Sequence, residues 1–184
     1  SGAWLMAVLA PLLLTASCDK TGGKPVLPGV SREAFSARWT DQKVVLAGLG
    51  DSITDGYGAS EGRAYFDMLT QNPKGDSPEM RGINLSAVLP RLKVLNLAMS
   101  ASTSIEHLGY QVSKLPVFPA DTLGIVCITS GGNDVIHDYG RSPPRDGAMY
   151  GAKLDEARPW IASYGKRLNA ILDGVDNAFP GGRH

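Results

Sequence analysis

Residues 43–56 read Lys43-Val-Val-Leu-Ala-Gly-Leu-Gly-Asp-Ser-Ile-Thr-Asp-Gly56. The run up to Leu49 is short, apolar and partly β-branched, which is typical of a buried parallel strand. A serine follows directly, with glycines nearby that permit a tight bend. We therefore expect Ser52 to present its hydroxyl, and its backbone N–H, just past the carboxyl end of a strand.

Two further strands are predicted downstream, and helices alternate with them. Apolar runs at 92–97 and 122–129 predict the strands, and apolar periodicity predicts helices at 61–71, 104–115 and 159–175. We expect Ser104 to cap the second helix and Pro159 to lie in the first turn of the third. Strand alternating with helix predicts an α/β fold with a parallel sheet. In such sheets, functional sites lie beyond the carboxyl ends of the strands.

The turns after the second and third strands therefore become candidate site segments. The second turn, residues 96–104, is rich in small residues that let a backbone approach a ligand. The third turn carries Asn133, whose side-chain amide can donate to a developing oxyanion. A preorganised donor of this kind contributes roughly 3–4 kcal/mol to the transition state of acyl transfer. Asp51 and Asp134 are expected to be structural carboxylates that bind loop amides.

Two of these turns carry motifs that resemble the SGNH (GDSL-like) hydrolase family. The sequence Gly50-Asp-Ser-Ile-Thr-Asp-Gly-Tyr-Gly58 resembles the nucleophile block of the family, with Ile53 in place of the leucine of its name. Gly131-Gly-Asn-Asp134 resembles its Gly-x-Asn-Asp block. The resemblance spans residues 44–178. It implies a three-layer, flavodoxin-like fold with a parallel sheet, and it implies that the protein hydrolyses esters.

The resemblance also implies roles for individual residues. Ser52 would be the catalytic nucleophile. The oxyanion hole would be formed by the backbone N–H groups of Ser52 and Ala101 and by the side chain of Asn133. No metal and no organic cofactor is implied, and the partner would be a small-molecule ester.

Two departures from the family pattern affect this interpretation. Ala101 replaces the glycine of the second block; alanine keeps the N–H, so the oxyanion hole survives unless the backbone there needs a positive φ. The last block of the family, Asp-x-x-His, is not found, because Gly181 stands where its aspartate should precede His184. We therefore expect the chain to be a fragment that lacks the C-terminal strands and the activating histidine and aspartate, and that is inactive alone.

The N-terminal residues predict export. Residues 4–17 form an uncharged, mostly apolar run that is shorter than the roughly 20 residues of a membrane span and fits a secretory signal. Leu14-Thr-Ala-Ser-Cys18 resembles a bacterial lipoprotein cleavage site, which implies lipidation of Cys18 and a lipid anchor in the membrane. The predicted division is a partial signal peptide (1–18), a tether (19–40) and a truncated hydrolase domain (41–184). A buried helix is the alternative for the apolar run.

Composition narrows the remaining function classes. Lys plus Arg and Asp plus Glu both total 18, so the net charge is zero and gives no electrostatic reason to bind nucleic acid. Two cysteines are too few for a disulfide scaffold or a thiolate zinc site. The sequence thus predicts a serine esterase that forms an acyl-enzyme on Ser52, in the bacterial cell envelope, either lipid-anchored or secreted to the periplasm. The alternatives are a non-catalytic module that binds an acyl or sugar ligand, and a flavodoxin-like flavin binder.

Overall fold

The computed structural model describes residues 31–76, 78–135 and 152–181. Its sheet consists of the parallel strands β1 (Lys43–Gly50), β2 (Leu92–Asn96) and β3 (Thr122–Thr129), in the order β2-β1-β3. The register places Leu46 of the central strand opposite Val94 on one side and Ile125 on the other. The predicted parallel α/β fold is confirmed, and each strand ends within one residue of its predicted bounds.

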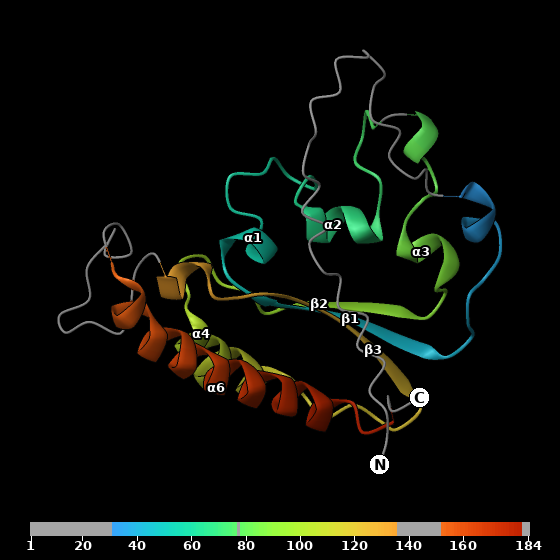
Figure 1. Ribbon diagram of the computed structural model, residues 1–184. Coiled ribbons are helices and arrows are strands. Elements are labelled where there is room, and N and C mark those ends of the chain that lie inside the picture. Colours follow the sequence, from blue (N-terminus) through green and yellow to red (C-terminus); the bar gives the residue numbers. More distant parts are fainter. Residues whose placement is uncertain (1–30, 77, 136–151, 182–184) are drawn as a thin grey trace. The chain divides into compact units, whose positions relative to one another are not determined.

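Helices cover both faces of this sheet. Figure 1 shows α1, α2 and α3 on one side and α4 and α6 on the other, which gives three layers. The helical elements are η1 (Arg32–Phe35), α1 (Ser52–Asp55), α2 (Tyr65–Thr70), η2 (Pro78–Met80), α3 (Leu85–Val88), α4 (Ser104–Glu106), the π-helical turn η3 (His107–Gln111), α5 (Val112–Lys114) and α6 (Leu154–Ala178).

The central strand supplies the core of both layers. Val45 and Ala47 pack in one cluster with Ala178 at the end of α6, whereas Val44 packs with Val88 of α3 in another. Successive side chains of a strand point to opposite faces, so the neighbouring Val44 and Val45 pack against opposite helical layers. Burial on both faces explains why the run from Val44 to Leu49 is almost continuously apolar.

Two predicted helices have different bounds in the structure. The helix predicted from residue 61 begins only at Tyr65, because Gly62 has φ 70°, a left-handed conformation that interrupts an α-helix. The helix predicted from Pro159 begins five residues earlier, at Leu154, so Pro159 lies inside α6 rather than in its first turn. The apolar periodicity of 159–175 predicts that Ile161 and Leu172 face inward, but both residues are exposed.

The segment after β2 also departs from a regular α-helix. Thr103, not the predicted Ser104, is the N-cap, and it forms a reciprocal capping box with Glu106. The π turn that follows adds a residue to one helical turn and therefore rotates the buried face. In this segment Ile105 is exposed, while His107 and Gln111 are buried.

Residues 31–40, assigned above to the tether, contact the rest of the domain. Arg32 donates to the carbonyl oxygens of Pro78 and Arg81 at 3.1 and 3.0 Å, and the backbone N–H of Trp39 donates to Val88 at 2.9 Å. Cys18 and the rest of the predicted signal peptide lie outside the described residues. Within the described ranges, no helix is both long and apolar enough to cross a membrane.

Candidate active site

The three turns beyond the strands are joined at Gly50, the last residue of β1. Its carbonyl oxygen accepts hydrogen bonds from the backbone N–H of Met99 (2.9 Å), the hydroxyl of Ser102 (3.0 Å) and the side-chain amide of Gln111 (2.8 Å). Its own N–H donates to the side-chain oxygen of Gln111 at 2.7 Å. The end of β1 is therefore fixed to the second turn and to the π turn at once.

Glycine is required at position 50. Its φ is 123°, and a Cβ there would lie 2.1 Å from the carbonyl oxygen of Thr129. That carbonyl accepts the backbone N–H of Asp51 at 3.1 Å, which draws the first turn onto the end of β3. Any side chain at Gly50 would separate these two turns.

Asp51 organises the start of helix α1. Its carboxylate accepts the backbone N–H of Ile53 at 3.0 Å, which caps the helix, and the hydroxyl of Thr129 at 2.9 Å. The hydroxyl of Thr129 also lies 2.9 Å from that of Thr54. These bonds agree with the structural role expected for Asp51. They place Ser52 as the half-buried first residue of α1, where its N–H needs no partner within the helix.

The second turn is a tight β-turn with a strained residue. The backbone N–H of Ser102 donates to the carbonyl of Met99 at 3.2 Å, and Ala101 has φ 64°. A positive φ at the third position, two residues after Met99, is the mark of a type II turn, which favours glycine there. Ala101 is the one non-glycine residue of the described chain with a positive φ. For a residue with a Cβ, this left-handed conformation costs roughly 1–2 kcal/mol.

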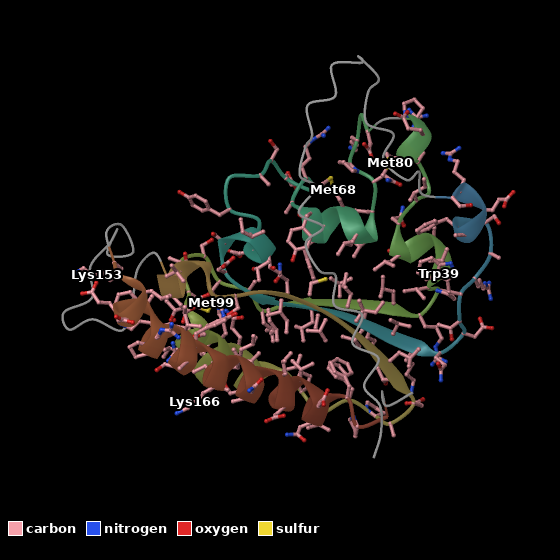
Figure 2. All side chains as sticks on the ribbon, viewed as in Figure 1. Trp39, Met68, Met80, Met99, Lys153 and Lys166 are labelled. Carbon is pink, nitrogen blue, oxygen red and sulfur yellow. The ribbon has the colours of Figure 1, made fainter. Side chains whose placement is uncertain are left out.

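The sequence analysis named one condition that would put Ala101 in conflict with its position, which is a positive φ at residue 101. The backbone does require a positive φ, and alanine adopts it under strain. Alanine nevertheless keeps a backbone N–H at this position, which the resemblance assigns to an oxyanion hole. In the view of Figure 2, Met99, the first residue of this turn, lies toward the end of the molecule where Lys153 is labelled, and Trp39 lies toward the other end.

Asn133 connects the third turn to the second. Its side-chain amide donates to the carbonyl oxygen of Ser102 at 2.8 Å, which uses one of its two N–H bonds. Next to it, the carboxylate of Asp134 accepts both the backbone N–H of Ser104 (2.9 Å) and the Ser104 hydroxyl. Asp134 thus binds a loop amide, as expected of a structural carboxylate.

Arg167 of α6 completes this contact. Its Nη2 atom lies 3.1 Å from the Asp134 carboxylate, which is 7% exposed, and its Nε atom donates to the Ser104 hydroxyl at 2.6 Å. One guanidinium therefore binds both members of the Ser104–Asp134 pair. The sequence analysis missed Arg167, because only the folded chain brings α6 to the third turn.

His107 and Gln111 form a buried polar network behind the turns. The two ring nitrogens of His107 lie 2.9 Å from the hydroxyl of Ser102 and 2.8 Å from that of Ser130. Burial lowers the pKa of His107, although the carboxylates of Asp134 and Asp51 oppose that shift. His107 is the one histidine in the described ranges, and both of its nitrogens are occupied by these serines rather than by Ser52. His137 and His184 lie outside those ranges.

The donors proposed from sequence remain available at this end of the sheet. In the described part of the chain, neither the N–H of Ser52 nor that of Ala101 donates to a protein acceptor, and Asn133 retains a second N–H. Such N–H groups are suited to stabilise negative charge on a ligand oxygen. Among the same residues, no group of three or more histidine, cysteine, aspartate or glutamate side chains is placed to hold a metal.

Comparison with known proteins agrees with this architecture. The family model of the GDSL-like lipases/acylhydrolases matches residues 46–180, from the middle of β1 to just past α6. No curated protein matches the chain closely enough to count as a relative. Because the family match covers most of the chain and includes all three turns, the chain belongs to the GDSL-like lipase/acylhydrolase family, a family of hydrolases.

Proposed function

We propose that this chain carries the nucleophile and oxyanion hole of a serine esterase that hydrolyses carboxylic esters through an acyl-enzyme on Ser52. The observation that carries the proposal is the pair of unused N–H groups on Ser52 and Ala101, in turns that are both bonded to the end of β1. A serine at the first position of a short helix, with a second free amide in a turn bonded to the same strand end, suits the needs of acyl transfer.

The reaction would proceed in two steps, acylation and then deacylation of Ser52. As a general base removes the proton of the Ser52 hydroxyl, its oxygen attacks the ester carbonyl carbon, and the carbonyl electron pair moves onto oxygen. The N–H groups of Ser52 and Ala101 and the side chain of Asn133 hold that oxyanion. Collapse of the intermediate breaks the bond to the alcohol, which leaves with the proton that the base took from Ser52. Water, deprotonated by the same base, then attacks the acyl carbon, and the base returns this proton to the Ser52 oxygen as the acid leaves.

The base in this scheme is not His107. Its nitrogens are bonded to Ser102 and Ser130, and its ring is only 1% exposed. The histidine and aspartate that activate Ser52 are proposed to be those of an Asp-x-x-His block, as in the resemblance described above.

Replacement of Ser52 by alanine tests the proposal. Hydrolysis of a p-nitrophenyl ester by the gene product should fall to the background rate in Ser52→Ala. The matched control is Ser60→Ala, which removes an exposed hydroxyl from the loop after α1 and should retain full activity. Equal hydrolysis by Ser52→Ala and the unaltered protein would refute the proposal. Saturable binding of an acyl or sugar ligand without turnover would instead favour the non-catalytic binding module.

We also propose that the protein is exported and anchored in the bacterial cell envelope by a lipid on Cys18. The support is the apolar run at residues 4–17 that ends in a small-residue stretch before this cysteine. Cells given a labelled fatty acid should incorporate it into the unaltered protein and not into Cys18→Ser. Equal labelling of Cys18→Ser would contradict the anchor. Cys127→Ser is the matched control and should be labelled like the unaltered protein, because Cys127 lies within β3.

A further inference from the structure

His107 connects the second and third turns, which carry two of the candidate oxyanion donors. Its Nε2 atom lies 2.9 Å from the hydroxyl oxygen of Ser102, and its Nδ1 atom lies 2.8 Å from that of Ser130. His107 is almost completely buried, and hydrogen bonds shielded from water in this way are stronger than those at the surface. One imidazole therefore bridges the turn after β2 and the turn after β3.

Ser102 is the residue at which this bridge reaches the donors. Its backbone N–H closes the turn that contains Ala101, by donating to the carbonyl oxygen of Met99 at 3.2 Å. Its carbonyl oxygen accepts one N–H of the Asn133 side chain at 2.8 Å. An amide group is planar, so binding this N–H restricts the direction of the second. His107 thus contacts the same residue that orients Asn133.

The contacts of the Ser102 hydroxyl assign the proton on His107. The hydroxyl oxygen lies 2.7 Å from the carbonyl oxygen of Met99 and 3.0 Å from that of Gly50. A carbonyl has no hydrogen to share, so oxygens this close require the hydroxyl proton between them. The hydroxyl then accepts from Nε2–H of His107. A neutral imidazole has one N–H, which leaves Nδ1 to accept from the hydroxyl of Ser130.

We propose that His107 is a positioning residue that holds the second and third turns at the separation at which Asn133 can bind Ser102 and still donate to the oxyanion. The inference rests on the proposed function, since that function assigns Asn133 to the oxyanion hole. A second link between the same turns, the bonds of Asp134 to Ser104, remains when His107 is replaced. Loss of His107 should therefore misplace the donor rather than unfold the domain.

Three substitutions test whether the bridge matters. His107→Leu fills similar space without polar atoms, and Ser130→Ala removes only the partner in the third turn. Each should lower kcat roughly three- to ten-fold with KM nearly unchanged, because the displaced donor acts on the transition state. His107→Gln keeps a donor and an acceptor on one side-chain carbon, as imidazole does, and should stay within about two-fold of the unaltered protein.

Val88→Ala is the control for a general loss of stability. It removes buried methyl groups from α3, which lies on the other side of the sheet from α4 (Figure 1). It should lower Tm and leave kcat unchanged at a temperature at which circular dichroism shows every variant to be folded.

A double-mutant cycle tests whether His107 acts through Asn133. In the Asn133→Ala background the donor is gone, so adding His107→Leu should lower kcat by less than about two-fold. A role that does not involve Asn133 would instead lower kcat by the same factor in both backgrounds.

Nitrogen NMR of the histidine-labelled protein gives a readout that needs no activity. Near neutral pH the Nε2 atom of His107 should carry the proton and Nδ1 should not, with His107→Gln used to assign the signal. The opposite tautomer would overturn the proposal, because Nε2 could then not donate to Ser102.

The kinetic outcomes separate the two proposals. An unchanged kcat in both His107→Leu and Ser130→Ala, or an equal effect of His107→Leu with and without the Asn133 side chain, would overturn the positioning role. If His107→Leu does not fold, Ser130→Ala and the tautomer decide. If the gene product hydrolyses no ester and Ser52 forms no adduct, the proposed function fails and the inference fails with it, whatever the tautomer of His107.

Discussion

The side-chain amide of Asn133 donates to the carbonyl oxygen of Ser102 over 2.8 Å. This bond ties the turn after β3 to the turn that carries Ala101. The same amide has a second N–H that the bond does not use, and Asn133 is half-buried rather than enclosed. One side chain can therefore fix the relative position of two turns and still donate to a bound oxyanion.

Replacing this donor should slow catalysis more than it weakens binding. Asn133→Asp keeps the shape but replaces the N–H donors with acceptors, and kcat of the gene product should fall about 100- to 1,000-fold. KM should change little, because the lost interaction forms in the transition state. Steady-state kinetics measure both constants, with circular dichroism as the check on folding. A folded Asn133→Asp variant with nearly normal kcat would remove Asn133 from the oxyanion hole.

The Arg167–Asp134 pair should contribute more to stability than a surface pair. Arg167→Met leaves the buried Asp134 carboxylate with only its bonds to Ser104, and we expect a loss of about 2–4 kcal/mol in the free energy of unfolding. Arg167→Lys should recover part of the loss, since lysine keeps the charge but not the planar fork. Chemical denaturation measures these differences.

The matched control for that experiment lies on the same helix. Arg158 pairs with Asp155 at 3.8 Å, and both side chains are largely exposed. Arg158→Met should therefore change the free energy of unfolding by less than about 0.5 kcal/mol. Equal losses of unfolding free energy in the two methionine variants would show that burial does not increase the contribution of the Arg167–Asp134 pair to stability.

The buried His107 should make the folded state less stable in acid. Burial lowers its pKa in the folded state, so above about pH 6.5 the ring is neutral in both states and the stability is fully present. As the pH falls below that value, the unfolded chain binds a proton that the folded chain resists, and stability declines by at most about 1.4 kcal/mol per pH unit.

His107→Gln tests this pH dependence. The variant should show a smaller change in the free energy of unfolding between about pH 5 and pH 7 than the unaltered protein, whatever its absolute stability. Denaturant titrations at several pH values supply the slopes. An unchanged slope in His107→Gln would mean that the acid sensitivity arises from other groups.

Gln111 should be essential to the end of β1. It is fully buried, and its amide bonds both the N–H and the carbonyl oxygen of Gly50. Gln111→Leu leaves the Gly50 N–H without an acceptor, and we expect a loss of about 2–3 kcal/mol in the free energy of unfolding. Gln71→Leu, at an exposed position after α2, should stay within about 0.5 kcal/mol. Similar losses in both variants would contradict this role.

The sequence predicted the elements whose signals are local. The β1 run is apolar because both faces of this central strand are covered, and the bounds of β1 and β3 could be predicted almost to the residue. The roles of Asp51 and Asp134 in binding loop groups could also be anticipated, since each stands beside a turn with free amides. The strands position these turns, so the end of the sheet at which the candidate residues gather could be predicted from the sequence.

The remaining features depend on contacts that no local pattern specifies. The segment 104–115, which contains the π turn at 107–111, buries the polar His107 and Gln111 and exposes the apolar Ile105, which apolar periodicity does not predict. Arg167 is indistinguishable from a surface arginine until α6 packs near Ser104. The capping box does have a sequence signal, since Thr103 precedes Glu106 by three residues, but the neighbouring Ser104 is an equally typical N-cap residue.

The most direct test of the whole account is to trap the acyl group on Ser52. The gene product would be mixed with a p-nitrophenyl ester, quenched in acid within the first turnover, and mapped by peptide mass spectrometry. We predict an acyl adduct on the peptide that contains Ser52, no adduct in Ser52→Ala, and an undiminished adduct in Ser60→Ala. Hydrolysis at an undiminished rate by Ser52→Ala, or an adduct on another residue, would contradict the assignment of Ser52 as the nucleophile.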